Sequence, residues 1–131
     1  ISTSIYSQTK EYTGIYKRHF DINEEGSIEY QLELSPDGTF TFHNYRKISA
    51  KNQEENQYGK GNWKIEKNKV LYFYTNKKND LDKKHTLNFT NTKARYITKS
   101  KRDKSDKEVK NHLRFYDSEI SWIKGNKLFK D

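Results

Sequence analysis

Four histidines, His19, His43, His85 and His112, are the residues of this 131-residue chain best suited to proton transfer or metal binding. They are scattered, with no HExxH motif, whereas zinc sites need His, Cys or carboxylate ligands close together. His43 and His85 fall on predicted strands, where cross-strand pairing could bring the two together. The chain has no cysteine, which excludes a thiol nucleophile, a disulfide and a Cys-based metal site. The sequence therefore predicts no metal site and no cofactor.

Catalytic arrangements are equally weak in the sequence. A Ser-His-Asp triad depends on space and not on chain order, but the GxSxG elbow that would mark one is absent. The carboxylate pairs Glu24-Glu25 and Glu54-Glu55 fall in predicted loops, whereas acid–base carboxylates need a desolvated cleft to shift their pKa. No Gly-rich phosphate loop is present. We interpret the chain as a protein that is not an enzyme, with no catalytic residues.

A predicted hairpin over residues 59–75 is the centre of the fold. Trp63 and Ile65 alternate with polar residues, which is the period of a strand with one buried face. A turn over 67–69 follows, in which Asn68 is the residue expected to take the left-handed conformation. Residues 70–75 then form an apolar strand, predicted to be central in its sheet because both faces are apolar. Gly59 and Gly61 indicate a bulge or a close approach of two backbones.

The rest of the chain reads as further short strands, predicted over 11–20, 27–34, 39–47, 85–91, 93–99 and 112–117. Ser35-Pro36-Asp37-Gly38 is a strong turn signal between two of them, since Pro fixes φ and Gly accepts a positive φ. Ser105 and Glu108 have capping-box spacing, which allows a short helical turn. Residues 1–10 form a polar lead-in, and 11–131 form one domain. Eight to ten strands with little helix predict an all-β, single antiparallel up-and-down barrel, with a flattened sandwich as the alternative.

The composition is polar and basic. Hydrophobic residues make up 31% of the chain, but 10 Tyr, 7 Phe and 2 Trp supply large rings that can fill a core. The net charge of +8 raises the question of a polyanionic partner. Most of the positive charge is Lys, whereas Arg is preferred for phosphate and base recognition. The charge therefore favours a solvated surface over a nucleic-acid site.

Three segments carry a family resemblance: Gly14-Ile15-Tyr16, then Ser35-Pro36-Asp37-Gly38-Thr39-Phe40-Thr41-Phe42, and then Gly61-Asn62-Trp63-Lys64-Ile65 followed by Val70-Leu71-Tyr72. Together they resemble small bacterial lipocalin-like (calycin-type) domains, over roughly residues 12–129. Typical lipocalins carry Gly-x-Trp on the first strand, where this chain has Gly14-Ile15-Tyr16. The resemblance implies an antiparallel barrel whose interior can hold a small apolar ligand. It also implies an exported or lipid-anchored protein, attached to a membrane surface through a removed N-terminal segment.

The favoured function is a binding or accessory module with a small apolar ligand inside the barrel. A barrel of about eight strands either is filled by its side chains or admits one small ligand. A filled core would instead make the domain a scaffold for a protein partner that the sequence does not identify. The alternative is a polyanion binder acting through Lys99, Lys101, Arg102 and Lys104. The predicted cavity-lining residues are Tyr30, Leu32, Phe40, Phe42, Trp63, Ile65, Tyr72, Tyr74, Leu87 and Phe89.

Overall fold

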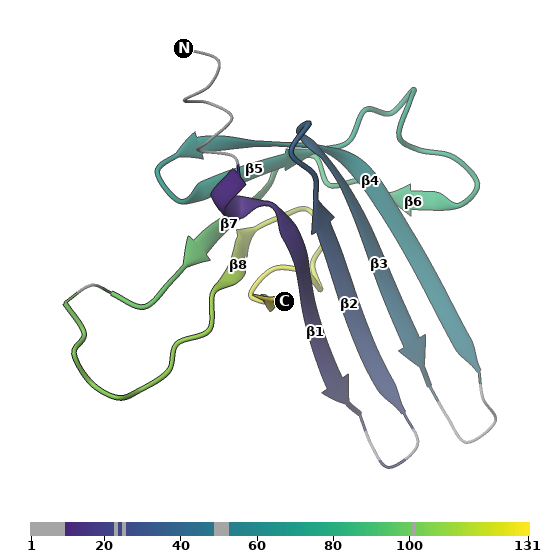
Figure 1. Cartoon of the computed structure of the whole chain (residues 1–131). Helices are drawn as coiled ribbons and strands as arrows, with labels where there is room; N and C mark the ends of the chain where they lie inside the picture. The colour runs from purple at the N-terminus through teal and green to yellow at the C-terminus, as the bar shows by residue number, and fades with distance from the viewer. Residues whose placement is uncertain (1–9, 23, 25, 49–52, 101) are drawn as a thin grey trace.

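The computed structural model describes residues 10–22, 24, 26–48, 53–100 and 102–131, which form nine β-strands and almost no helix (Figure 1). The predicted all-β class is confirmed. Residues 1–9 of the predicted lead-in over 1–10 lie outside the described residues, as do Lys101 and Glu25 of the predicted carboxylate pair. The strands are β1 (Gly14–Asp21), β2 (Ser27–Leu34), β3 (Thr39–Lys47), β4 (Glu54–Lys67), β5 (Val70–Tyr74), β6 (His85–Leu87), β7 (Thr92–Ile97), β8 (His112–Asp117) and β9 (Lys127–Lys130).

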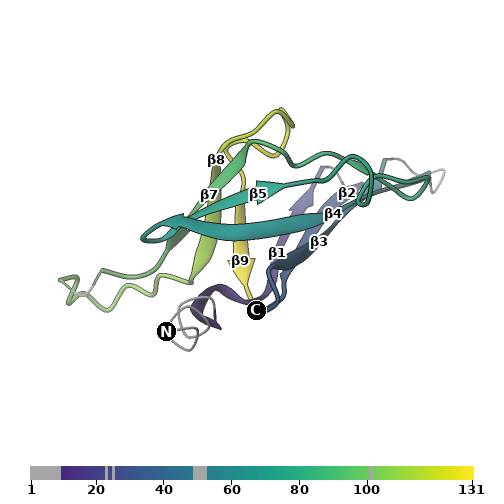
Figure 2. The same cartoon turned by 90° about the horizontal axis from the view of Figure 1, so that it is seen from above.

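Eight of these strands close into an antiparallel barrel. Each pairs with the next barrel strand along the chain, from β1 through β5 and then from β7 to β9, and β9 returns to pair with β1. This is the predicted up-and-down order. The ninth strand, β6, lies outside the ring and pairs in parallel with β4 at Tyr58 and Gly59. Viewed from above, residues 102–111 extend away from the barrel between β7 and β8 (Figure 2).

The chain reverses where the turn residues predicted it, but in one turn a different residue adopts the left-handed conformation. Gly38 has a φ of 90° and donates its N–H to the Ser35 carbonyl at 3.1 Å, as the turn signal requires. Between β4 and β5 the left-handed residue is Lys69, with a φ of 64°, and not Asn68. The β4–β5 register shifts by a bulge between Ile65 and Lys67. An extra residue in a bulged strand moves the left-handed position along the turn, which accounts for the difference.

The first strand begins later than predicted. Residues 10–12 are helical, so Tyr12 lies in a helical turn and not on β1. Thr13 caps that turn by donating its hydroxyl to the Lys10 carbonyl at 2.9 Å. Gly14 then adopts a φ of 134°, which a residue with a Cβ rarely takes, and the strand starts there. The Tyr12 ring still packs into the core, edge-on to Tyr96 at 5.0 Å.

Two further predicted elements differ. The predicted strand over 85–91 ends at Leu87, because the Phe89 N–H is bonded to the Thr75 hydroxyl at 2.8 Å and not to a neighbouring strand. The capping-box spacing does not produce a helical turn. Instead, the Ser105 hydroxyl accepts the Lys107 N–H at 3.3 Å, a local turn that competes with helix formation. Within the part of the chain that is described, no helix is long and apolar enough to cross a membrane.

β4 is the strand that shapes the barrel, since it pairs with β3 along its first half and with β5 along its second. Gly59 and Gly61 sit at the changeover. A Cβ on Gly61 would collide with the Tyr74 backbone carbonyl, and one on Gly59 would lie 2.8 Å from the Phe89 ring. These are the close approaches that the two glycines indicated, and they let the strand bend across the core.

Aromatic rings fill the core. Phe40, Phe42, Phe73 and Phe89 are almost fully buried, and their ring centroids lie 5.0–5.3 Å apart in the contacts Phe40–Phe73, Phe40–Phe89 and Phe42–Phe89. Such edge-to-face and tilted contacts are the favoured geometries of packed rings. The middle of the barrel is therefore occupied by its own side chains.

Candidate functional site

The candidate site lies where the sheet of β1 to β4 continues past the filled core. These four strands extend beyond the shorter strands of the barrel and form an open end (Figure 1). Their inward residues follow one another in cross-strand rows. The row at the core is apolar, the next row is polar, and the last row combines two apolar with two charged residues. The rows are Tyr16, Leu32, Phe42 and Gly59; then Arg18, Tyr30, Asn44 and Gln57; then Phe20, Ile28, Arg46 and Glu55.

Two stacked rings form the apolar wall of this open end. Trp122, from the turn segment between β8 and β9, lies parallel to Tyr30 with centroids 5.5 Å apart and planes at 17°. Phe42 lies 6.0 Å from both rings and joins the pair to the core. Asn126 holds the Trp122 segment in place by donating its side-chain amide to the Trp122 carbonyl at 2.5 Å. Ile123, the next residue, is fully buried in the core and anchors the same segment.

Two buried polar groups beside the stacked rings lack partners among the described residues. Asn44 is only 3% exposed and donates its amide to Gln57 at 2.9 Å, but its Oδ1 accepts no hydrogen bond. The Nε of Arg46 is likewise buried without an acceptor. Native proteins satisfy nearly all buried polar atoms, since leaving one unpaired costs about 1–3 kcal/mol. These two atoms therefore leave hydrogen-bonding capacity free at one place beside the rings.

These groups surround a hollow of about 170 Å³ that opens to solvent. Burial raises the pKa of the Tyr30 phenol above its ordinary value, although nearby Arg46 and a hydrogen bond with Asn126 act in the opposite direction. Tyr30 is therefore neutral at physiological pH, and Arg46 is the charge that faces the hollow. The lining residues are Ile28, Tyr30, Asn44, Arg46, Gln57 and Trp122.

The ten predicted cavity residues divide into two groups. Seven are buried in the core, and Ile65 packs against it while partly exposed: these are Tyr30, Leu32, Phe40, Phe42, Trp63, Ile65, Leu87 and Phe89. Tyr72 and Tyr74 do not join them, because β5 turns Leu71 and Phe73 inward and places these two rings on the outer face. Of the ten, only Tyr30 lines the hollow at the open end.

The residues that sequence reasoning missed carry a signal in the alternation of β3. Phe40 and Phe42 were assigned to the inward face, and the same period continues through Asn44 to Arg46. The same alternation places the neighbouring Tyr45 on the outer face, where it donates its hydroxyl to Glu54 at 3.0 Å.

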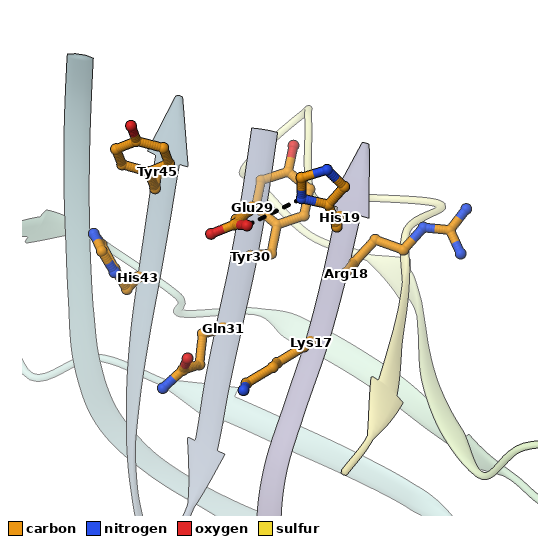
Figure 3. Close-up of a pocket in the computed structure, with 8 residues that line it drawn as sticks. All are labelled: Lys17, Arg18, His19, Glu29, Tyr30, Gln31, His43 and Tyr45. Carbon is orange, nitrogen blue, oxygen red and sulfur yellow. Dashed lines mark hydrogen bonds and ion pairs between the residues drawn. The ribbon is translucent and has the colours of Figure 1, made fainter. Parts of the chain in front are cut away.

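A second hollow, of about 190 Å³, lies on the outer face of β1 to β3 (Figure 3). His19 contacts Glu29 at 3.0 Å and Asp21 at 2.9 Å, and hydrogen bonds to these two carboxylates raise the pKa of its imidazole. Arg18 extends away from the other side chains drawn there. His19 and Glu29 pair with each other on an exposed face, and Lys17 pairs with Asp131 outside the hollow. These charged groups are already engaged, so this hollow offers less to a ligand than the open end does.

The two strand histidines do not meet. The His43 ring stacks on Tyr58 with centroids 4.5 Å apart, and Tyr58 separates it from His85, whose centroid lies 6.2 Å from the tyrosine. His85 instead contacts Asp82 at 3.0 Å. The described residues contain no group of three or more His, Asp or Glu side chains placed to hold a metal ion.

The predicted polyanion site lies on the segment between β7 and β8. Lys99 donates its ammonium to the Ser105 carbonyl at 2.6 Å, so one of the four basic groups is engaged within the segment. Arg102 and Lys104 are exposed. Asp103, Asp106 and Glu108 lie in the same stretch and offset much of its positive charge.

No protein family matches this chain, and no curated protein or solved structure matches it either. The closed eight-stranded antiparallel barrel is compatible with a lipocalin-like fold, and that architecture is what the chain shares with such domains.

Proposed function

We propose that this chain is a non-enzymatic binding module that holds one small ligand at the open end of its barrel. The observation that carries the proposal is the pairing of an aromatic wall, Tyr30 on Trp122, with the unpaired Oδ1 of buried Asn44 beside one hollow. Ligand sites are typically apolar and concave, with a few convergent polar groups that fix orientation.

Because packed rings fill the core, the proposed ligand lies at the rim of the barrel and not in its interior. A ligand among Phe40, Phe42 and Phe89 would have to displace side chains whose centroids are about 5 Å apart. The hollow of about 170 Å³ is smaller than the 300–1,000 Å³ of sites that enclose drug-sized molecules. It suits a single ring or a short acyl chain, and a long lipid tail would not fit.

A binding role is supported over a catalytic one by where the titratable groups lie. The histidine with two carboxylate partners, His19, is on the exposed outer face of the sheet. General acid–base catalysis needs such a pair to be aimed at a substrate in a water-excluded site. At the open end, Asn44, Tyr30 and the Trp122 ring are groups suited to orienting and stacking a ligand.

The test uses the two tryptophans as internal reporters. Trp122 borders the hollow, whereas Trp63 is buried elsewhere and donates its indole N–H to the Ser35 carbonyl at 3.1 Å. A ¹H–¹⁵N spectrum should therefore show two indole signals, assigned by the loss of one in Trp122→Phe. In a screen of single-ring and short-chain compounds, we expect binders to move the Trp122 signal and leave the Trp63 signal in place.

The opposite pattern would contradict the proposal. If binders moved the Trp63 signal and the core amides instead, the ligand would lie inside the barrel. If no compound moved the Trp122 signal, the open end would not be a ligand site. A polyanion binder would show itself differently, because affinity for an oligonucleotide or an acidic glycan would fall steeply as salt is raised.

A further inference from the structure

The charge that faces the hollow comes from Arg46, and it points to the kind of ligand. Resting on the proposed function, we infer that the ligand is a small amphipathic anion: its carboxylate, or a similar oxyanion, pairs with Arg46, and its apolar part lies against Trp122 and Tyr30. This inference adds the ligand's charge and its orientation.

Arg46 faces inward because β3 alternates. It follows Phe40, Phe42 and Asn44 on one face, and it is the first cationic residue of that series beyond the core. Its Nε is buried and has no acceptor among the described residues. A guanidinium that has lost part of its hydration gains strongly from an anionic acceptor, since charge-assisted hydrogen bonds are about twice as strong as neutral ones.

The carboxylate nearest to Arg46 along the sheet does not neutralise it. Glu55 is its direct partner in the β3–β4 register, yet no ion pair within 4.0 Å joins the two side chains. Glu55 is exposed, so solvent screens its charge. The Tyr30 phenol is neutral, so Arg46 carries the one formal charge among the described residues that line the hollow. An anionic ligand would therefore face a cation there and no carboxylate among those lining residues.

Asn44 supplies a second polar contact. Its amide bonds with Gln57 at 2.9 Å and leaves one terminal atom of the Asn44 side chain buried and unpaired. Whichever way that amide is oriented, the free atom offers one hydrogen bond to the ligand. Arg46 thus recognises the negative head of the ligand, and the buried Asn44 amide recognises a nearby polar group. The stacked rings of Tyr30 and Trp122 contact its flat or aliphatic body.

The experiment compares ligands that differ only in charge. Benzoate is paired with benzamide and octanoate with octanamide, and each is titrated into the full chain while the indole signals are followed. We expect each carboxylate to move the Trp122 signal and to bind roughly tenfold or more tightly than its amide, the gain from one charge-assisted contact. Arg46→Gln should abolish that preference.

Lys47→Gln is the matched control. It removes the same charge from the next residue of β3, whose side chain lies on the opposite face of the sheet, so the preference for carboxylates should persist. Glu55→Gln should strengthen carboxylate binding, because it removes the carboxylate nearest to Arg46 in the register.

The possible outcomes distinguish a wrong ligand charge from the absence of a ligand site at the open end. If amide and carboxylate move the Trp122 signal with equal affinity, the open end binds ligands but the inferred charge is wrong. If carboxylates bind equally well to Arg46→Gln, Arg46 is not their partner, and the inference fails. If neither member of any pair moves the Trp122 signal, the proposed function fails with it.

Discussion

Replacing Phe89 with alanine tests whether side chains fill the barrel, on which the placement of the ligand at the rim depends. Phe89 has no exposed surface, and its centroid lies 5.1 Å from Phe40 and 5.0 Å from Phe42. Removing a buried phenyl group from such a site costs about 3–5 kcal/mol, because the neighbouring rings cannot close the space. Domains of this size are typically stable by about 5–15 kcal/mol, so the variant should still fold.

The assay is equilibrium unfolding in urea, with and without benzene. We expect Phe89→Ala to lower the free energy of unfolding by about 3–5 kcal/mol with an unchanged dependence on urea. The deletion leaves an apolar space lined by Phe40 and Phe42, and such cavities stay dry and bind benzene. Benzene should then stabilise the variant by mass action and leave the parent protein unaffected.

Tyr74→Ala is the aromatic control. Tyr74 is 38% exposed and, among the described residues, stacks only on its outer-face neighbour Tyr72, with centroids 6.2 Å apart. Its removal should cost less than about 1 kcal/mol, as surface substitutions do. If Phe89→Ala cost no more than Tyr74→Ala and benzene had no effect, the rings would not be packed, and the interior would again be the candidate ligand space.

Three further predictions concern single contacts. Gly61→Ala should lower stability by about 1–3 kcal/mol or more in urea unfolding, because its methyl would meet the Tyr74 carbonyl; an unchanged midpoint would refute this close approach. The backbone N–H of His85, the His85 side chain and the backbone N–H of Lys84 all bond to Asp82 and lower its pKa to about 2. The contribution of Asp82 to stability is therefore present above the ordinary pKa of 3.8 and is lost as the pH falls toward 2. Asp82→Asn should accordingly unfold more easily than the parent at neutral pH but not near pH 2, and a difference independent of pH would contradict the assignment. The His19 imidazole should titrate above pH 6.5 by NMR, and its pKa should move back toward 6.5 in Asp21→Asn. Its stabilising effect should be present below pH 6.5 and lost as the pH rises through the pKa of the folded protein. A His19 titration midpoint that the substitution left unchanged would exclude the contact.

Sequence patterns predicted the barrel because most paired strands follow one another in the chain and their apolar and polar residues alternate clearly. Residues 27–34 and 39–47 match β2 and β3, since the Ser35–Gly38 turn fixes both their ends and their register. Elements whose ends depend on distant contacts were harder to predict. The Phe89 N–H leaves the strand pattern for the Thr75 hydroxyl, fourteen residues away in the sequence, and no local signal indicates that bond.

The candidate site was harder to predict for a related reason. Periodicity assigns Tyr72 a face but does not say which face is inward when both are apolar, and packing against β4 and β7 decides it. The alternation of β3 already placed Arg46 with Phe40. What the sequence does not contain is that β1 to β4 extend past the shorter strands of the barrel, so that an inward arginine emerges at a rim and not in the interior.

The seam of the barrel is formed by the two ends of the described chain. β1 and β9 pair through only two residue pairs, Tyr16 with Lys130 and Lys17 with Phe129, and Asp131 adds its N–H to the Ile15 carbonyl at 2.8 Å. Strands this far apart in the sequence meet only after the intervening meander has formed, so ring closure is expected to be the last step of folding and the first to reverse. Because the chain lacks cysteine, two thiols introduced across this seam would have no competing partner. A single covalent staple there would join the first strand to the last and turn a noncovalently closed ring into a permanently closed one.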